Sequence, residues 1–353
     1  MVGLRGLSPE KEEGQDRLSM LQGMRRVMRL LIAGTLYYGG IFRLLLKRRA
    51  QQRKTCVLGL HRILECNTRK YSSSLNSIVL DKAVFADLLD FLDRHFHLVS
   101  LEGFLSGNGA GSRPCCLITF DDGWHDNYSA AYPQLKSHNC PATIFLTTEM
   151  IGSERTFWVE QLRTACKDPQ LFLRVRAKTT KLLNKKGRRV TLEQIIEQLK
   201  RMPASRRREF LADVSLPITQ VQANGMLTWR QVAEMSSDGI EFGSHTASHA
   251  ILPYEEDRTI EHELSFSKQQ IESKLARKVR SFAYPNGDWD ERVRQRVERA
   301  GYECAFTTRA GWSAPGEDRY TIPRILLHDG NVTGLGGKFS PAAFALTLMG
   351  WRS

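Results

Sequence analysis

The sequence lacks the features that hold a small secreted protein together by disulfide bonds. It has seven cysteines in 353 residues, an odd number, and no pair of them has the Cys-x-x-Cys spacing of a zinc site. This pattern argues against a disulfide framework and favours a reducing compartment. Hydrophobic residues make up 41% of the chain. That content is enough for one sizeable α/β domain or two smaller ones with a core of their own.

The sequence also lacks an uninterrupted apolar segment long enough to cross a membrane. The candidate run, residues 30–46, is 17 residues long and contains Arg43 and three glycines, whereas a spanning helix needs about 20 apolar residues. It begins too late for an ordinary signal peptide and has no small-residue cleavage site. Because basic residues flank it, we predict an interfacial or re-entrant membrane-associating helix over residues 21–54, with an amphipathic helix packed on the domain as the alternative. Residues 1–20 are polar and are expected to be disordered.

Acidic residues are scarce where the positive charge is concentrated. The formal net charge is +13, yet residues 24–54 contain nine Arg and Lys and no Asp or Glu. Residues 171–210 contain thirteen Arg and Lys against three Glu, so the rest of the chain is mildly acidic. Nucleic-acid-binding proteins more often carry positive charge on the domain itself, interleaved with aromatic residues. We therefore expect no nucleic-acid partner.

Strand-like and helix-like segments alternate over residues 55–330. A basic helical segment at residues 153–224 interrupts this alternation and is predicted to be an insertion that caps the active site. Residues 331–353 form a C-terminal tail with a short apolar helix. Strand–helix alternation over this length predicts an α/β fold with a parallel sheet or a (β/α) barrel.

Chemically reactive side chains gather where predicted strands end. Asp121 and Asp122 directly follow one strand, and two adjacent carboxylates are costly to bury unless a metal ion or a division of roles explains them. A solvated Asp-Asp-Gly turn is the alternative reading. His245 and His249 follow another strand and stand four residues apart, a spacing that suits one metal ion. The carboxyl ends of strands in such folds share one face, so these residues can converge on a site with two imidazoles and one carboxylate.

Four motifs follow one another along the chain: Thr119-Phe120-Asp121-Asp122-Gly123, His245-Thr246-Ala247-Ser248-His249, Tyr284-Pro285-Asn286-Gly287 and Leu326-Leu327-His328. Their order resembles that of the polysaccharide deacetylase family, also called NodB homology or carbohydrate esterase family 4 proteins. The resemblance covers residues 55–330 and implies a deformed (β/α) barrel of about seven strands. It also implies a divalent metal ion, with Zn²⁺ expected, and hydrolysis of N-acetyl groups. By position, Asp122, His245 and His249 match the metal ligands, Asp121 the catalytic base and His328 the catalytic acid.

The third motif departs from the family's common form. Many members have Arg-Pro-Pro-Tyr where this chain has Ala283-Tyr284-Pro285-Asn286, so the arginine that pairs with the catalytic base is missing. Arg324 is a candidate substitute, and a surface salt bridge is the alternative reading of it. The Phe-Ala-Tyr-Pro form resembles an exopolysaccharide-associated subgroup. We expect Tyr284, Pro285 and Asn286 to face the substrate, with a backbone N–H near Asn286 stabilising an oxyanion.

Five further residues are weaker candidates for the same pocket. His61 also ends a strand, although a structural role is favoured for it. His125 and Asp126 are candidates to support the metal ligands. Trp158 and Trp229 could stack on a sugar ring, with core packing as their default role.

The function expected from the resemblance is metal-dependent N-deacetylation of an amino sugar in a polysaccharide or lipid-linked glycan. Two alternatives remain open: a non-sugar amide hydrolase on the same fold, and a non-catalytic glycan-binding module that keeps the metal. The protein is expected at a membrane surface, and its cysteines favour the cytoplasmic face.

Overall fold

The computed structural model describes residues 9–66, 73–107, 111–182, 190–214 and 225–351. A curled parallel sheet forms its centre, in the order β10-β1-β5-β6-β7-β8-β9, with β4 paired to the first two residues of β5. The strands are β1 Thr55–Leu60, β4 His97–Leu98, β5 Cys115–Phe120, β6 Ala142–Leu146, β7 Glu241–Ser244, β8 Ser281–Ala283, β9 Cys304–Phe306 and β10 Ile325–Leu326. A small second sheet pairs β2 (Arg62–Leu64) with β3 (Val79–Asp81). The seven-strand path confirms the predicted deformed (β/α) barrel.

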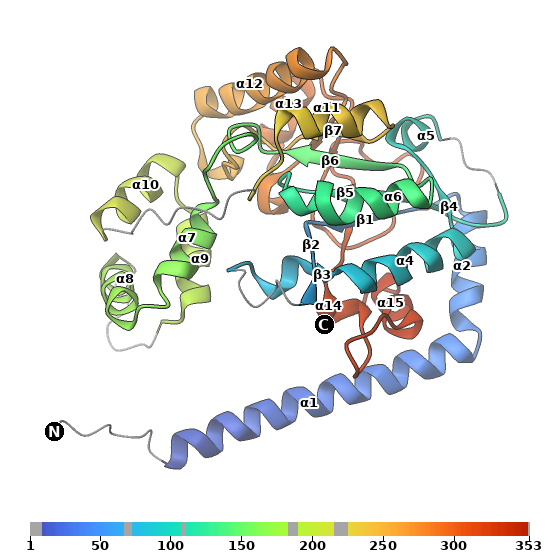
Figure 1. Cartoon of the computed structure of the whole chain (residues 1–353), viewed down its shortest axis with the longest axis horizontal. Helices are drawn as coiled ribbons and strands as arrows, with labels where there is room; N and C mark the ends of the chain where they lie inside the picture. The colour runs from blue at the N-terminus through green and yellow to red at the C-terminus, as the bar shows by residue number, and fades with distance from the viewer. Residues whose placement is uncertain (1–8, 67–72, 108–110, 183–189, 215–224, 352–353) are drawn as a thin grey trace.

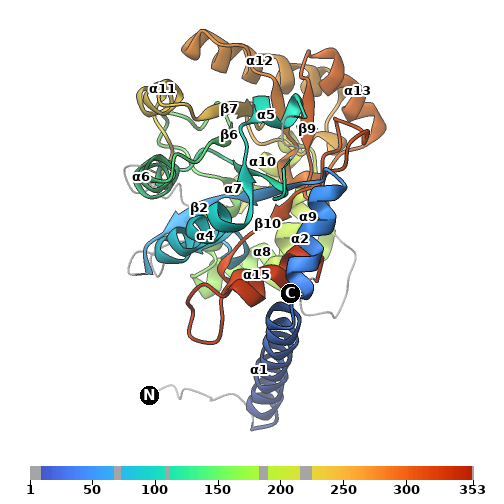
Figure 2. The ribbon, with the colours of Figure 1, turned by 90° about the vertical axis from the view of Figure 1, so that its right-hand side faces the viewer.

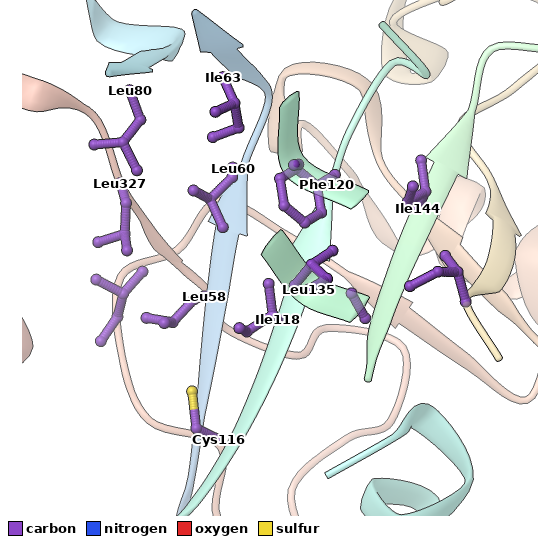
Figure 3. Packing of buried hydrophobic residues seen from close by; sticks show 14 of the residues in the cluster. Leu58, Leu60, Ile63, Leu80, Cys116, Ile118, Phe120, Leu135, Ile144 and Leu327 are labelled. Carbon is purple, nitrogen blue, oxygen red and sulfur yellow. The ribbon is translucent and has the colours of Figure 1, made fainter. Parts of the chain in front are cut away.

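Both faces of the central strands are covered, which explains why they are continuous apolar runs rather than alternating ones. Every residue of β5 is buried. Alternate residues pack on opposite faces, because side chains alternate along a strand. Ile118 and Phe120 join the large outer core together with Leu58 and Leu60 of β1 (Figure 3). Leu117 belongs to a second cluster inside the curl of the sheet.

Helices cover the outer face of the sheet (Figures 1 and 2). They are α4 Lys82–His95, α6 Tyr132–Ser137, α11 Trp229–Ser237, α12 Asp257–Leu275, α13 Glu291–Arg299, α14 Asp329–Val332 and α15 Pro341–Leu348. The short helix α5 (Leu101–Leu105) instead packs on the cluster inside the curl. Single turns occur at η1 Asn76–Ile78, η2 Asn127–Ala131, η3 Leu252–Tyr254 and η4 Pro285–Gly287. Side-chain caps set several helix starts. The Asp81 carboxylate, for example, accepts the N–H groups of Ala83 and Val84, which satisfies otherwise unpaired donors of the first turn.

The predicted insertion forms a small helical unit beyond the carboxyl ends of the strands (Figure 1). Its helices are α7 Trp158–Ala165, α8 Pro169–Leu182, α9 Leu192–Lys200 and α10 Ala204–Asp213. Their apolar faces build a separate buried cluster that includes Leu162, Val175, Ile195 and Leu199. The insertion is therefore stabilised largely by its own core. Parts of the predicted range, residues 183–189 and 215–224, lie outside the described residues.

Two helices precede the barrel, α1 (Pro9–Tyr38) and α2 (Ile41–Gln51), and α1 packs on α15. Residues 9–20 are helical, which corrects the expectation of disorder for that part of residues 1–20; residues 1–8 lie outside the described residues. The segment is rich in Glu, Lys, Gln, Arg, Leu and Met, which are strong helix formers. Within the described chain, neither helix alone is long and apolar enough to span a membrane. Taken together, Gly23–Tyr38 and Ile41–Gln51, bent by 66°, meet the length and composition expected of a broken span.

Candidate metal centre and active site

The loop after β5 brings two neighbouring carboxylates to the same place. Side chains at adjacent positions of a strand point to opposite faces, but β5 ends at Phe120 and Asp122 adopts a left-handed backbone with φ of 76°. Gly123 follows with φ of 81°, and a Cβ there would meet Leu146 Cδ2 at 2.9 Å. The turn thus starts at Asp122 itself, one residue earlier than Gly123. Asp121 and Asp122 are both buried at the carboxyl edge of the sheet.

Asp122 lies beside the two histidines of the second motif. Its Oδ1 atom is 3.6 Å from His245 Nε2 and 3.4 Å from His249 Nε2. One ligand atom from each of the three residues lies within 4.8 Å of the other two. The predicted metal ligands are therefore brought together, although they come from the ends of β5 and β7.

The protonation pattern of these three side chains suits a metal ion. His245 Nδ1 donates to the Ala283 carbonyl at 2.7 Å, which leaves Nε2 with its lone pair toward Asp122. Burial lowers the pKa of both His245 and His249, so both imidazoles are neutral, as ligands must be. Burial raises the pKa of Asp122 to about 6. Its buried Oδ1 atom has no hydrogen-bond donor among the described residues, which is the situation that a bound cation would relieve.

A glutamate on α12 holds the histidine loop in shape. The Glu263 carboxylate accepts the N–H groups of Ala247 and Ser248, both at 2.9 Å, and the Ser248 hydroxyl at 2.6 Å. Thr246 and His249 in this loop have positive φ values of 66° and 62°, which are strained for residues with a side chain. The three hydrogen bonds offset this strain. Sequence reasoning missed Glu263, and the signal was a carboxylate on the buried face of an amphipathic helix.

Aromatic and basic residues support Asp122 from the other side. Trp124 Nε1 donates to Asp122 Oδ2 at 2.8 Å, and the Arg62 guanidinium stacks on the Trp124 ring at 4.2 Å. Asp126 pairs with Arg62 at 2.9 Å, so it acts on the metal ligand indirectly, through Arg62 and Trp124. His125, the other expected supporting residue, instead packs near Tyr128.

The insertion reaches the site through Phe157, whose ring lies 5.1 Å from His249 and 5.1 Å from Trp124. Trp158, next in sequence, packs with the insertion core under Arg207, and Trp229 packs against the main core. Both tryptophans therefore have packing roles.

Arg324 is the partner of Asp121. Its two terminal nitrogens donate to both carboxylate oxygens at 2.7 Å. The arginine is fully buried, with Nε bonded to the Thr307 carbonyl at 3.0 Å. Burial alone would raise the pKa of Asp121, but the charge and hydrogen bonds of Arg324 outweigh it and hold that pKa well below its usual range. Arg324 thus replaces the arginine missing from the third motif, and the surface salt-bridge reading is wrong.

The structure brings His61 to Asp121. His61 follows β1, the strand paired with β5, and its Nε2 atom lies 3.7 Å from Asp121 Oδ2. Asn127 Nδ2 donates to the His61 carbonyl at 2.7 Å and fixes this strand end. His328 follows β10 and caps α14, where its Nδ1 accepts the Gly330 N–H at 3.1 Å. His61 thus lies beside Asp121 in the site, which was the alternative to the structural role favoured for it from the sequence.

The third motif supports the site differently from expectation. Tyr284 is fully buried, and its hydroxyl donates to the Tyr320 carbonyl at 3.0 Å. Its side chain thus belongs to the core, and the expectation that it faces the substrate is wrong. Pro285 is also buried, whereas Asn286 is exposed and accepts a hydrogen bond from Lys200 of the insertion at 2.9 Å. The motif contributes directly to the site through the Ala283 carbonyl, which accepts a hydrogen bond from His245 and orients its ring.

Comparisons with known proteins agree with this architecture. The chain is 23% identical over 219 residues to the Bacillus subtilis (strain 168) protein provisionally named polysaccharide deacetylase YxkH. That match covers 62% of this chain and 53% of YxkH, so it spans about half of the relative's length.

Solved structures share the fold at low sequence identity. The Streptococcus pyogenes deacetylase PplD, solved in complex with acetate, has a TM-score of 0.54 at 20% identity over 82% of this chain and 99% of its own. The Bacillus cereus polysaccharide deacetylase BC0361 has a TM-score of 0.52 at 20% identity, covering 78% of this chain and 65% of its own. IcaB from Ammonifex degensii also has a TM-score of 0.52 at 20% identity, covering 78% and 91%.

The family match itself spans the first three motifs and most of the barrel. Residues 108–305, more than half of the chain, match the family described as polysaccharide deacetylase. His61 and Arg324 lie outside this range: His61 directly follows β1, and Arg324 directly precedes β10. With Asp121, Asp122, His245 and His249 inside it and together in space, the chain belongs to the polysaccharide deacetylase family.

Proposed function

We propose that this protein is a metal-dependent hydrolase that removes acetyl groups from N-acetylated amino sugars in a polysaccharide or lipid-linked glycan. The observation that carries the proposal is a buried, arginine-paired carboxylate, Asp121, directly beside the Asp122–His245–His249 cluster. Family membership supports the reaction class. The related fold of PplD, a deacetylase solved with acetate, is consistent with it.

Asp122, His245 and His249 are the residues that would hold the metal ion. A divalent ion bound there would supply Lewis-acid chemistry and would leave positions open for water and substrate. Two neutral imidazoles and one carboxylate favour Zn²⁺ as the first candidate, although the same ligand set accepts other divalent ions.

Asp121 is placed to take a proton. Arg324 keeps the carboxylate ionised and fixes its orientation, so that it presents a defined acceptor next to the metal ligands. A carboxylate held this way can accept the proton of an attacking water. The surrounding burial excludes bulk water, which strengthens the electrostatic interactions within the site.

His61 is placed to give a proton. An amine leaves as a stable product only when it is protonated, so the reaction needs a general acid. His61 Nε2 lies 3.7 Å from Asp121, on the same edge of the sheet. We therefore assign the acid role to His61, and retain His328 as the alternative to be tested.

The insertion is proposed to cap the bound glycan. Phe157 packs on His249, and Lys200 bonds Asn286 on the opposite loop, so helices α7 and α9 both reach the strand ends. The excess of Arg and Lys in residues 171–210 would attract an anionic glycan or lipid-linked substrate.

The test is acetate release from N-acetylglucosamine oligomers by the metal-loaded protein. Asp121→Asn is expected to lower the rate by about 10²- to 10⁴-fold while the bound metal content stays at the wild-type level. Asp122→Asn is expected to lose both metal and activity. Oligomer binding without acetate release by the wild type would favour the glycan-binding alternative. Acetate release only from small non-sugar amides would favour the alternative of a non-sugar amide hydrolase.

A further inference from the structure

The N-terminal helices present a row of exposed apolar side chains to solvent. Seven of the eleven large hydrophobic residues exposed in the described chain lie here, with exposed fractions between 41% and 83%. We call them the apolar stripe: Met24, Val27, Met28, Leu31 and Tyr38 on α1, and Ile41 and Leu44 on α2. Such a concentration is unusual for a surface that faces only water, where exposed apolar residues are normally scattered singly.

The stripe lies on the side of α1 that does not pack against the rest of the protein. At 3.6 residues per turn, positions 24, 27, 28, 31 and 38 lie on one side of the helix and positions 29, 33 and 36 on the opposite side. The opposite side is docked: Ala33 packs with Ala342 and Leu346 of α15. Arg29 donates to the Gly330 carbonyl at 3.2 Å. The domain therefore fixes α1 with the stripe exposed on its other side. Figure 1 shows α1 running along one edge of the molecule.

Positive charge borders the stripe. Arg25, Arg43, Lys47 and Arg48 are exposed, and none of these four forms an ion pair within the described residues. No Asp or Glu occurs from residue 24 to residue 54. An apolar row bordered by unpaired cations complements a lipid surface with anionic headgroups.

We propose that the apolar stripe docks the protein on an anionic phospholipid surface, with α1 lying along the interface and α2 rising from it. A spanning arrangement would strip Arg26 and Arg29 of their bonds to the barrel and would draw Arg43 into hydrocarbon. Self-association through this face is disfavoured because a two-fold contact would oppose two acid-free basic segments. This inference does not depend on the proposed deacetylase activity.

The experiment is flotation of the full-length protein with vesicles of phosphatidylcholine alone or of phosphatidylcholine mixed with phosphatidylglycerol. Binding is expected to the anionic vesicles and to weaken as salt rises. Leu31→Glu and Leu44→Glu should each lower the partition coefficient roughly tenfold or more. Arg43→Gln and Lys47→Gln should each lower it about fivefold on anionic vesicles. The matched control is Leu173→Glu on α8, where the leucine is 51% exposed far from the stripe, and it should bind as the wild type does.

Every substituted side chain is exposed, so each variant is expected to fold. Circular dichroism melts of each variant check this. Wild-type binding by Leu31→Glu and Leu44→Glu would overturn the proposal. So would equal, salt-independent binding to both kinds of vesicle. Light scattering in the absence of lipid tests whether a second copy of the chain covers the stripe. If the wild type is a dimer and Leu31→Glu is a monomer with unchanged vesicle binding, the stripe is a dimer interface and the proposal is overturned.

Discussion

At the residue scale, two adjacent carboxylates are made different by their neighbours. Asp121 and Asp122 are both buried, so desolvation raises the pKa of each. Arg324 reverses this effect for Asp121 only, and Asp122 faces two neutral imidazoles instead. Environments that push the pKa values of paired acids in opposite directions divide the roles between them.

Replacing Arg324 by methionine should destabilise the protein by about 3–5 kcal/mol, because the Asp121 charge would stay buried without a partner. Urea denaturation followed by circular dichroism measures the change. The control is Arg155→Ala, which removes a 67%-exposed arginine from its pair with Glu149 and should cost about 0–1 kcal/mol. Equal stability of Arg324→Met and the wild type would contradict the assigned role.

His61→Asn and His328→Asn should separate the two candidate acids. If His61 donates the proton, His61→Asn should lower kcat by about 10²- to 10⁴-fold at unchanged metal content. His328→Asn should leave kcat and stability close to the wild-type values, because asparagine is itself a favoured N-cap residue and can keep the cap of α14. Acetate-release kinetics and thermal melts of both variants distinguish the two candidates. A large loss of kcat in His328→Asn, with His61→Asn unaffected, would assign the acid role to His328.

The sequence led correctly to Asp121, Asp122, His245 and His249 as neighbours, and to Arg324 as the arginine for Asp121. It favoured His328 over His61 as the catalytic acid, although both residues end strands and no local pattern distinguishes them. The order β10-β1-β5 places the strand of His61 directly beside that of Asp121 and the strand of His328 one position further away. A single sequence does not encode this order in any local pattern. Nor could it reveal that Tyr284 packs inward, since an aromatic residue at a strand end suits either role.

At the element scale, the site depends on irregular loops fixed by regular elements. Asp122, Thr246, His249 and Asn286 all have positive φ values at the ends of strands or in the loops that follow. Non-glycine residues in that region each cost of the order of 1–3 kcal/mol, and this strain persists only where the surroundings impose it. Helix α12 holds the histidine loop in this strained conformation through the hydrogen bonds of Glu263.

Glu263→Gln should weaken metal binding by about 10- to 100-fold, because an amide cannot accept all three donors and the histidine loop loses its fixed shape. Competition with a chromophoric chelator measures the affinity. Glu261→Gln is the control, since Glu261 lies on the same helix with its carboxylate 69% exposed. An unchanged affinity in Glu263→Gln would mean that the backbone alone maintains the loop.

The elements themselves were largely predictable, but their boundaries and docking were not. Strand–helix alternation and the basic interruption correctly predicted the barrel and its inserted helices. The start of α1 at Pro9 does not follow from composition, because a polar segment suits disorder as well as helix; these residues are good helix formers that continue a docked helix. The contact of Phe157 with His249 depends on how the insertion folds back, which periodicity does not specify.

At the scale of the whole molecule, the metal ligands connect parts of the sheet that are not neighbours. Asp122 follows β5 and the two histidines follow β7, with β6 between these strands. An ion that binds only the folded chain stabilises it by mass action, by about 2.7 kcal/mol when its concentration is 100 times its dissociation constant.

Removing the metal with a chelator should therefore lower the melting temperature by several degrees and abolish acetate release, and added Zn²⁺ should restore both. Differential scanning calorimetry measures the shift. His249→Asn supplies the control, because a protein without the third ligand should melt at the same temperature with and without Zn²⁺. A metal-dependent shift that survives in His249→Asn would place the ion elsewhere.

The packing of α1 on α15 has a practical consequence for where the chain can be cut. Ala342 and Leu346 are buried because Ala33 covers them, and Arg29 hydrogen-bonds Thr347 at 3.2 Å. A shortened protein that starts at the barrel would therefore uncover an apolar face on its last helix. We expect such a form to precipitate even though its active site is intact, and a soluble version to require polar replacements at Ala342 and Leu346.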